Sequence, residues 1–173
     1  MKERIGFFGG CFNPVTKAHV SLIKDVIKKN DLDKVYFVPM GDLYSKEDLI
    51  PAKHRIAMLE FALQNEDKME VLNISNNNSK MSAIDSFKII DEKFKNCERF
   101  FIMGSDNYKK IHTWKESEKL LCNYKYIVLD RENGNTKDIS ASLVREKIKI
   151  DEISNDLISE QVIQYIKNNN LYR

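Results

Sequence analysis

The chain has 173 residues, and its 28 lysines and arginines against 26 aspartates and glutamates give a formal net charge of +2. At this length a folded chain buries roughly 70% of the surface that its unfolded form exposes, so one core can form without metals or disulfides. With 42% hydrophobic and 31% charged residues, the composition excludes a disordered or fibrous protein. The near-balanced charge argues against a large nucleic-acid surface, while a local basic pocket for a phosphorylated small molecule stays open.

The cysteines Cys11, Cys97 and Cys122 are odd in number and contain no CxxC pair. We therefore expect neither a disulfide framework nor a cysteine-built zinc site, and a reducing, cytoplasmic setting fits this usage. The first apolar run is broken too early, by two glycines and Pro14, to be a signal peptide. No apolar stretch reaches the roughly 18 residues that a membrane span needs, so no membrane contact is expected.

Apolar runs and amphipathic stretches alternate along most of the chain, which is the pattern of a parallel sheet flanked by helices. In the first amphipathic stretch, Val20, Ile23 and Ile27 recur at helical spacing, so one face of this helix packs on the sheet. In chain order the pattern predicts strand 4–9, helix 18–29, strand 34–39, helix 53–65, strand 69–74, helix 83–95, strand 99–103, helix 116–121 and strand 124–130.

The pattern changes after residue 130, where a polar, turn-rich segment leads into two short helices at 142–148 and 160–168. We interpret the chain as a single domain over residues 1–173, with a core of about 1–130 and a helical tail of about 138–173. The predicted fold class is α/β, a Rossmann-like doubly wound parallel sheet with that tail. In such sheets ligands bind beyond the carboxyl ends of the strands, near the point where the strand order reverses.

A glycine-rich turn follows the first strand. Gly9 and Gly10 let the backbone turn with no Cβ in the way of a ligand, and the next helix points its amino-terminal amides at the same space. Thr16 and His19 lie three residues apart at that helix start, so both can donate to a phosphate. The alternative is that the glycines only make a turn, Thr16 caps the helix and His19 lies at its surface.

A second phosphate-compatible helix start lies near the end of the chain. Ser140 and Ser142 offer hydroxyls and free amides, and Arg145 supplies a fixed positive charge with a forked donor. Ordinary helix capping with a solvated Arg145 is the alternative, and it would be preferred if this segment stood alone. Two such helix starts, about 120 residues apart, favour a shared anion instead.

These two segments resemble the signatures of the nucleotidyltransferase superfamily. The first is similar to G-x-F-x-P-(H/T)-x-x-H, in the threonine form and with Ala18 where many members have glycine. The second is similar to I-S-x-T-x-x-R, with serine at the threonine position. Residues 100–107 and 111–114 resemble the F-I-x-G-x-D and T-W block of bacterial nicotinate mononucleotide adenylyltransferases. Residues 51–59 resemble that family's H-R-x-x-M-L segment, and Asn170-Leu171-Tyr172 resembles its ending.

The resemblance implies a cytoplasmic enzyme of NAD biosynthesis that transfers AMP from ATP to nicotinate mononucleotide and releases pyrophosphate. Mg²⁺ would accompany the ATP, held by phosphate and water rather than by a protein site. The implied catalytic residues are His19 and Thr16. The implied ATP and phosphate contacts are Gly9, Gly10, Phe12, Lys46, Gly104, Asp106, Ser140, Ser142 and Arg145. The implied acceptor contacts are Asn13, Ala83 and Trp114, the last offering an indole face to a cationic pyridinium ring or, alternatively, only filling a core.

One departure from the family pattern concerns the acceptor. The family has S-Y-T-x-D-T at the acceptor-binding helix start, whereas this chain has Met81-Ser82-Ala83-Ile84-Asp85-Ser86. The backbone amide of Ala83 is still available to a carboxylate, but the tyrosine contact is lost. Nicotinamide mononucleotide therefore stays open as a second acceptor. The oligomeric state is also open, a homodimer included.

Two other functions are compatible with the phosphate motifs. The first is another superfamily transfer, such as adenylylation of phosphopantetheine, which gives no reason for an indole at position 114. The second is a nucleotide-binding sensor without catalysis, which would not need an intact His19 beside both phosphate elements. A sensor would bind ATP without releasing pyrophosphate.

Overall fold

The structure is a computed structural model that describes residues 2–43, 48–74, 81–130 and 141–173. Within these residues, one parallel sheet has the order β3-β2-β1-β4-β5. Its strands are β1 (Arg4–Gly10), β2 (Lys34–Pro39), β3 (Met69–Val71), β4 (Glu98–Gly104) and β5 (Lys125–Leu129). The α/β class and the all-parallel sheet predicted from the sequence are confirmed.

The helices follow the predicted alternation, with two additions. They are α1 (Lys17–Asn30), α2 (Ala52–Leu63), α3 (Ala83–Lys93), α4 (Ser105–Lys109), the 3₁₀ turn η1 (Ile111–Thr113), α5 (Ser117–Asn123), α6 (Ala141–Lys149) and α7 (Glu160–Asn168). The sequence predicts neither α4 nor η1, because elements this short have no room for a repeating apolar face. The third strand is also shorter than predicted, ending at residue 71 instead of 74.

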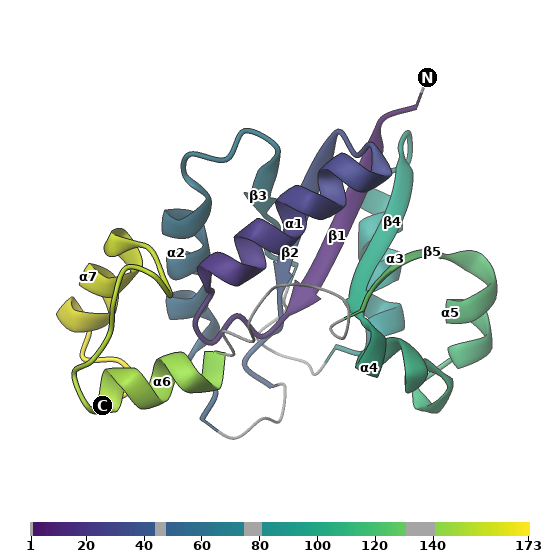
Figure 1. The fold of residues 1–173 in the computed structure, drawn as a ribbon. Coiled ribbons are helices and arrows are strands. Elements are labelled where there is room, and N and C mark those ends of the chain that lie inside the picture. Colours follow the sequence, from purple (N-terminus) through teal and green to yellow (C-terminus); the bar gives the residue numbers. More distant parts are fainter. Residues whose placement is uncertain (1, 44–47, 75–80, 131–140) are drawn as a thin grey trace.

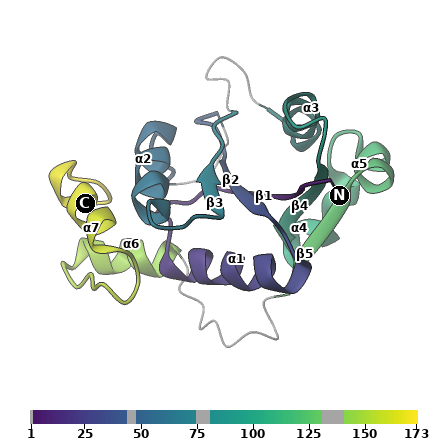
Figure 2. The same cartoon turned by 90° about the horizontal axis from the view of Figure 1, so that it is seen from above.

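Helices cover both faces of the sheet, and each face has its own apolar cluster. Alternate residues of β1 point to opposite sides: Phe8 joins the cluster under α1 and α2, and Phe7 joins the one under α3 and α5. Figure 2 shows α1 and α3 on opposite sides of the strands. The sheet is therefore doubly wound, and its strand order reverses between β1 and β4, the two strands that flank the predicted site.

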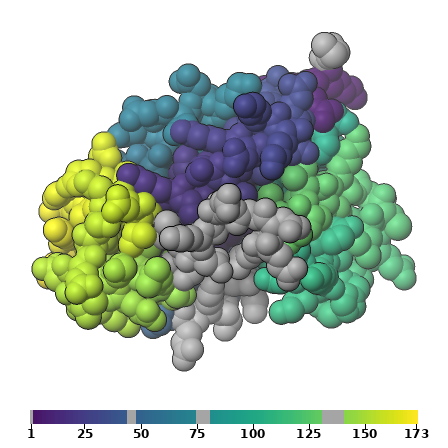
Figure 3. Space-filling model, viewed as in Figure 1, coloured from purple at the N-terminus to yellow at the C-terminus, as the bar shows by residue number. Residues whose placement is uncertain are grey.

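The carboxyl-terminal helices pack on the α1 face of the sheet. Val144 of α6 and Ile166 of α7 belong to the same buried cluster as Phe8 and Met58. Figure 3 shows the green and yellow surface of α6 and α7 directly beside the purple surface of α1. The tail thus adds apolar side chains to a core that the strands and α1 and α2 also build.

Cys11, Cys97 and Cys122 are all free thiols. Among the described residues, no helix is both long enough and apolar enough to cross a membrane.

Candidate active site

The glycine turn lies at the carboxyl end of β1, beside β4. The arrow of β1 in Figure 1 points to the edge of the sheet where α4 and α6 are found. A Cβ built on Gly10 would lie 2.9 Å from the Phe12 ring, so internal packing accounts for that glycine. A Cβ on the exposed Gly9 would meet no described atom within 4 Å. Gly9 therefore borders open space at the point where ligands bind in sheets of this kind.

Thr16 and His19 hold each other at the start of α1. Thr16 is the N-cap, and its hydroxyl accepts a hydrogen bond from the His19 amide at 3.4 Å. In return, His19 Nδ1 accepts from the Thr16 amide at 3.1 Å and lies 2.8 Å from the Thr16 hydroxyl oxygen. Because Nδ1 accepts from an N–H group, the proton of the neutral imidazole is on Nε2. This reciprocal cap fixes the orientation and the tautomer of the ring.

Phe12 and Asn13 are both 3% exposed, so their side chains serve the protein's own structure. The Phe12 ring packs edge-on against His19, with ring centroids 5.6 Å apart. Asn13 donates from Nδ2 to the Asp48 carbonyl at 2.8 Å, and its Oδ1 accepts from the Tyr172 hydroxyl at 2.9 Å. The ligand contacts that the resemblance implies for both residues stay predictions, and both side chains are packed or hydrogen-bonded within the protein.

Arg145 brings the second motif to the first. Its Nη1 donates to the Asn13 carbonyl at 2.8 Å, and its Nη2 lies 3.4 Å from the Ser142 hydroxyl. Ser142 is exposed at the start of α6. A direct hydrogen bond therefore joins α6 to the loop that precedes α1. Ser140 and Lys46 lie outside the described residues.

Arg55 is a supporting residue that the residue-by-residue reading of the sequence missed. It is 0% exposed, and it donates to the Cys11 carbonyl at 2.9 Å and to the Ile50 carbonyl at 2.8 Å. Burial lowers the pKa of the guanidinium, and the carboxylate of Asp42, 3.5 Å away, opposes that shift. A signal was present in the sequence, since Arg55 shares the buried helical face of Met58, where an arginine needs partners.

The other half of the candidate site lies between β4 and α3. Gly104 ends β4 and caps α4, and Asp106 is exposed in the first turn of α4. Trp114 is partly buried against the α3-side cluster. The next residue, Lys115, lies 3.7 Å from Asp85 in the first turn of α3. The segment around Trp114 therefore lies near the helix start that contains Ala83.

The start of α3 is a tightly built cap. Ser82 is the N-cap, and the Asp85 carboxylate accepts from the Ser82 hydroxyl at 2.6 Å and from its amide at 3.1 Å. These hydrogen bonds lower the pKa of Asp85 below its ordinary value of 3.8. The amides of Ala83 and Ile84 belong to the same first turn, which has no preceding helical carbonyls to bind.

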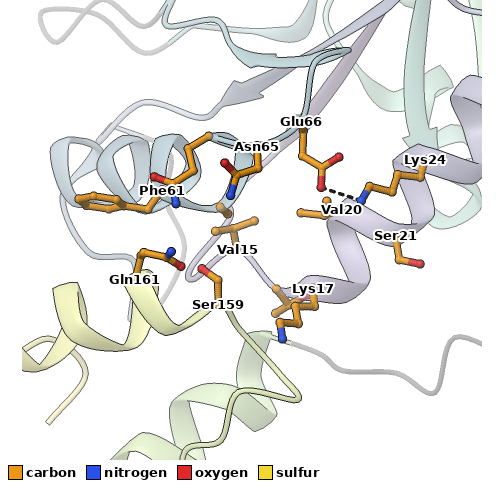
Figure 4. A pocket seen from close by; sticks show the side chains of 13 residues that line it. Val15, Lys17, Val20, Ser21, Lys24, Phe61, Asn65, Glu66, Ser159 and Gln161 are labelled. Atoms are coloured by element: carbon orange, nitrogen blue, oxygen red, sulfur yellow. Dashed lines mark ion pairs between the residues drawn. The ribbon is translucent and has the colours of Figure 1, made fainter.

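A groove of about 370 Å³ opens behind Thr16, between α1, the end of α2 and the start of α7 (Figure 4). Its wall includes the ion pair of Lys24 with Glu66, whose charged atoms are 2.6 Å apart. Its lining includes Thr16 but not Gly9, His19 or Arg145. Of the predicted site residues that the structure describes, the groove therefore shares only Thr16. Among the described residues, no cluster of three or more His, Cys, Asp or Glu side chains is arranged to hold a metal ion.

The chain is similar to known proteins over most of its length. A family model described as cytidylyltransferase-like matches residues 7–147. The chain is 30% identical to a probable nicotinate-nucleotide adenylyltransferase of Borreliella burgdorferi, over 98% of this chain and 96% of the relative. It is 29% identical to the protein of the same name from Staphylococcus haemolyticus, over 99% of this chain and 97% of that one.

The fold is also found in solved structures. The nicotinic acid mononucleotide adenylyltransferase of Plasmodium falciparum, solved in complex with NaAD, superposes with a TM-score of 0.82. The alignment covers 98% of this chain and 97% of the other at 22% sequence identity. A likeness at this identity establishes the shared fold.

Proposed function

The chain belongs to the nicotinate-nucleotide adenylyltransferases of the cytidylyltransferase-like family, and we propose that it transfers AMP from ATP to nicotinate mononucleotide. The products are the dinucleotide and pyrophosphate, which places the enzyme in NAD biosynthesis. The observation that carries the proposal is the hydrogen bond from Arg145 to the Asn13 carbonyl, because it holds α6 against the loop that leads into α1 and so brings the two phosphate motifs together.

In the proposed reaction, the 5′-phosphate oxygen of the acceptor attacks the α-phosphorus of ATP in line. A new P–O bond forms, the bond to the bridging oxygen of the β-phosphate breaks, and pyrophosphate leaves. Such a transfer needs little covalent help, so the protein acts by positioning and by stabilising charge. ATP enters as its magnesium complex, since Mg²⁺ is commonly bound through substrate phosphates and keeps several waters.

His19 is the proposed donor to the α-phosphate. With Nδ1 held by Thr16, the Nε2–H group can donate to a non-bridging oxygen whose charge increases in the transition state. Thr16 acts through this ring, because its hydroxyl is hydrogen-bonded to His19 and is 1% exposed. The open face of Gly9 lets the phosphates approach the backbone closely.

The leaving pyrophosphate is proposed to lie at the start of α6. There Ser142 and Arg145 offer a hydroxyl and a forked cation, and the helix amides add partial positive charge. Ser140 and Lys46 are proposed to contribute a hydroxyl and an ammonium group to the same phosphates. At the β4 end, Gly104 and Asp106 are proposed to hold ATP, with the carboxylate accepting from ribose hydroxyls.

The acceptor is proposed to lie between α3 and Trp114. A nicotinate carboxylate fits the first turn of α3, where the amides of Ala83 and Ile84 and the helix dipole favour a negative charge. The indole of Trp114 offers a face to the cationic pyridinium ring. The helix start therefore favours the anionic carboxylate of nicotinate mononucleotide over the neutral carboxamide of nicotinamide mononucleotide.

The proposal is tested by supplying ATP and magnesium with one acceptor at a time. The acceptors are nicotinate mononucleotide, nicotinamide mononucleotide and phosphopantetheine, and pyrophosphate release is measured for each. We expect the highest kcat/KM with nicotinate mononucleotide. Release with phosphopantetheine alone would assign the chain to another transfer, and ATP binding without any release would identify a sensor.

A further inference from the structure

The carboxyl end of the chain forms a turn after α7 that buries Leu171. The Leu171 amide donates back to the Ile166 carbonyl at 3.1 Å, and the Leu171 side chain is only 9% exposed. Asn170 and Tyr172, on either side of it, have φ angles of 49° and 64°. Left-handed backbone is uncommon for residues other than glycine, and it persists where the surrounding contacts determine it. This turn directs Tyr172 back toward the active-site loop.

Tyr172 reaches that loop at Asn13. Its hydroxyl donates to Asn13 Oδ1 at 2.9 Å, and the same oxygen accepts from the Ile50 amide at 3.4 Å. Burial raises the pKa of the Tyr172 hydroxyl well above its ordinary value of 10.0, although Arg145 and Arg55 oppose the shift. The hydroxyl therefore stays protonated and keeps its role as donor.

Asn13 connects this hydroxyl to the phosphate-binding side of the site. Its side chain is held by Tyr172, and its backbone carbonyl accepts the hydrogen bond from Arg145. Tyr172 and Arg145 are thus connected through Asn13, which makes one hydrogen bond to each of them. Asn13 is 3% exposed, so without the Tyr172 hydroxyl its Oδ1 would keep only the longer hydrogen bond from the Ile50 amide, and the loop would lose one of its restraints.

We propose that Tyr172 is a positioning residue for adenylyl transfer, which fixes Asn13 so that the Asn13 carbonyl holds Arg145 against the leaving pyrophosphate. The inference rests on the proposed function, because the pyrophosphate site is part of it. The carboxyl-terminal tail thereby has a second task besides packing on the sheet.

Tyr172→Phe tests the proposal, since it removes one hydroxyl and keeps the ring. The matched control is Tyr165→Phe, because the Tyr165 hydroxyl also makes one hydrogen bond, 3.0 Å from His54 Nδ1, but to α2 instead of the active-site loop. For Tyr172→Phe we expect the Kd of pyrophosphate, measured by calorimetry, to rise roughly tenfold, and kcat/KM for ATP to fall by a similar factor. The KM for nicotinate mononucleotide stays within twofold, and Tyr165→Phe leaves all three values unchanged.

A double variant shows whether the effect passes through Arg145. In an Arg145→Ala background, adding Tyr172→Phe is expected to change pyrophosphate affinity by less than twofold, because the group that it positions is gone. A tenfold loss of pyrophosphate affinity in the Arg145→Ala background would contradict the proposal that Tyr172 acts through Arg145.

The result that would overturn the inference is a Tyr172→Phe variant with wild-type pyrophosphate affinity and kinetics, whatever its melting temperature. Pyrophosphate binding is measured without acceptor or turnover. A chain that bound pyrophosphate in a Tyr172-dependent way but formed no dinucleotide would therefore contradict the proposed function, whereas a chain that formed dinucleotide but bound pyrophosphate independently of Tyr172 would contradict this inference alone.

Discussion

The imidazole of His19 is prepared for its proposed role by Thr16. The Thr16 amide and hydroxyl both meet Nδ1, so the opposite nitrogen carries the donor proton. Thr16 is thus better described as the residue that orients His19 than as a second phosphate donor. A spacing of three residues predicts that the two side chains meet, but it does not say which of their atoms bind each other.

Replacing His19 with alanine is expected to reduce kcat by about 10²–10³-fold, because a donor to the transition-state oxygens is lost. The Kd of ATP should change by less than about threefold, since Gly9, α4 and the α6 start are unaltered. Pyrophosphate release and ATP calorimetry measure the two quantities. His54→Ala, which removes another partly buried histidine, is the control, and a kcat in His19→Ala equal to that of the control would exclude the role of His19.

The contacts of three residues could not be predicted from their positions in the sequence: Phe12, Asn13 and Arg55. Motif spacing places Phe12 and Asn13 in the phosphate loop, yet both side chains turn inward. Arg55 lies 44 residues from the Cys11 carbonyl that it supports. Such long-range contacts depend on how the helices pack, so no local pattern predicts them.

At the level of elements, the helices of seven or more residues were predictable, and the two shortest, α4 and η1, were not. The apolar spacing predicts α1 and α7 to within one residue at each end, because each buries a continuous face. The helix α4 and the turn η1 are specified by their contacts at the end of β4, which the sequence pattern does not contain. They matter for the site, since they lead from Gly104 to Trp114.

The cap of α3 provides a prediction about pH. Asp85 has a folded-state pKa below 3.8, so its carboxylate contributes stability above that pH, and this contribution is lost as the pH falls through the folded value. Asp85→Asn should lower the free energy of unfolding by about 0.3–1 kcal/mol at pH 7. In urea denaturation, the difference in unfolding free energy between wild type and Asp85→Asn should shrink below about pH 4.

The control for the cap is Asp25→Asn, at an exposed position of α1. It removes one negative charge without touching a helix start, so a loss common to both variants would be a general charge effect. A gap between wild type and Asp85→Asn that stayed constant or widened down to pH 3 would contradict the account of the cap.

The tail provides a prediction about cooperativity. Ile166 is 2% exposed in the cluster shared with the strands, so Ile166→Ala should cost about 2–5 kcal/mol. Ile150→Ala, at a position 63% exposed in the same tail, should cost less than about 0.5 kcal/mol.

Unfolding of the Ile166 variant is followed by circular dichroism and by Trp114 fluorescence. Trp114 lies on the opposite face of the sheet, so coincident transitions would mean that the tail and the core unfold as the single domain proposed from the sequence. An early transition in circular dichroism, with the fluorescence transition unmoved, would show that the tail is an independent unit.

For the whole molecule, the net charge of +2 says nothing of where the hydrogen-bond donors of the two phosphate motifs lie. The two motifs are far apart in the chain, and the order of the elements predicts only that both face the carboxyl edge of the sheet. Their direct contact, from Arg145 to Asn13, required the tail to fold back beside α1. The acceptor is proposed to bind at the start of α3, where the chain departs from the family pattern.

The central claim is that this site transfers AMP from ATP to nicotinate mononucleotide. The most direct measurement uses ATP labelled at the α-phosphate, with magnesium and nicotinate mononucleotide, and follows the label during turnover. We expect the label to enter the dinucleotide, in a one-to-one ratio with the pyrophosphate released. Label that stayed in ATP, or that was released as free AMP, would contradict it.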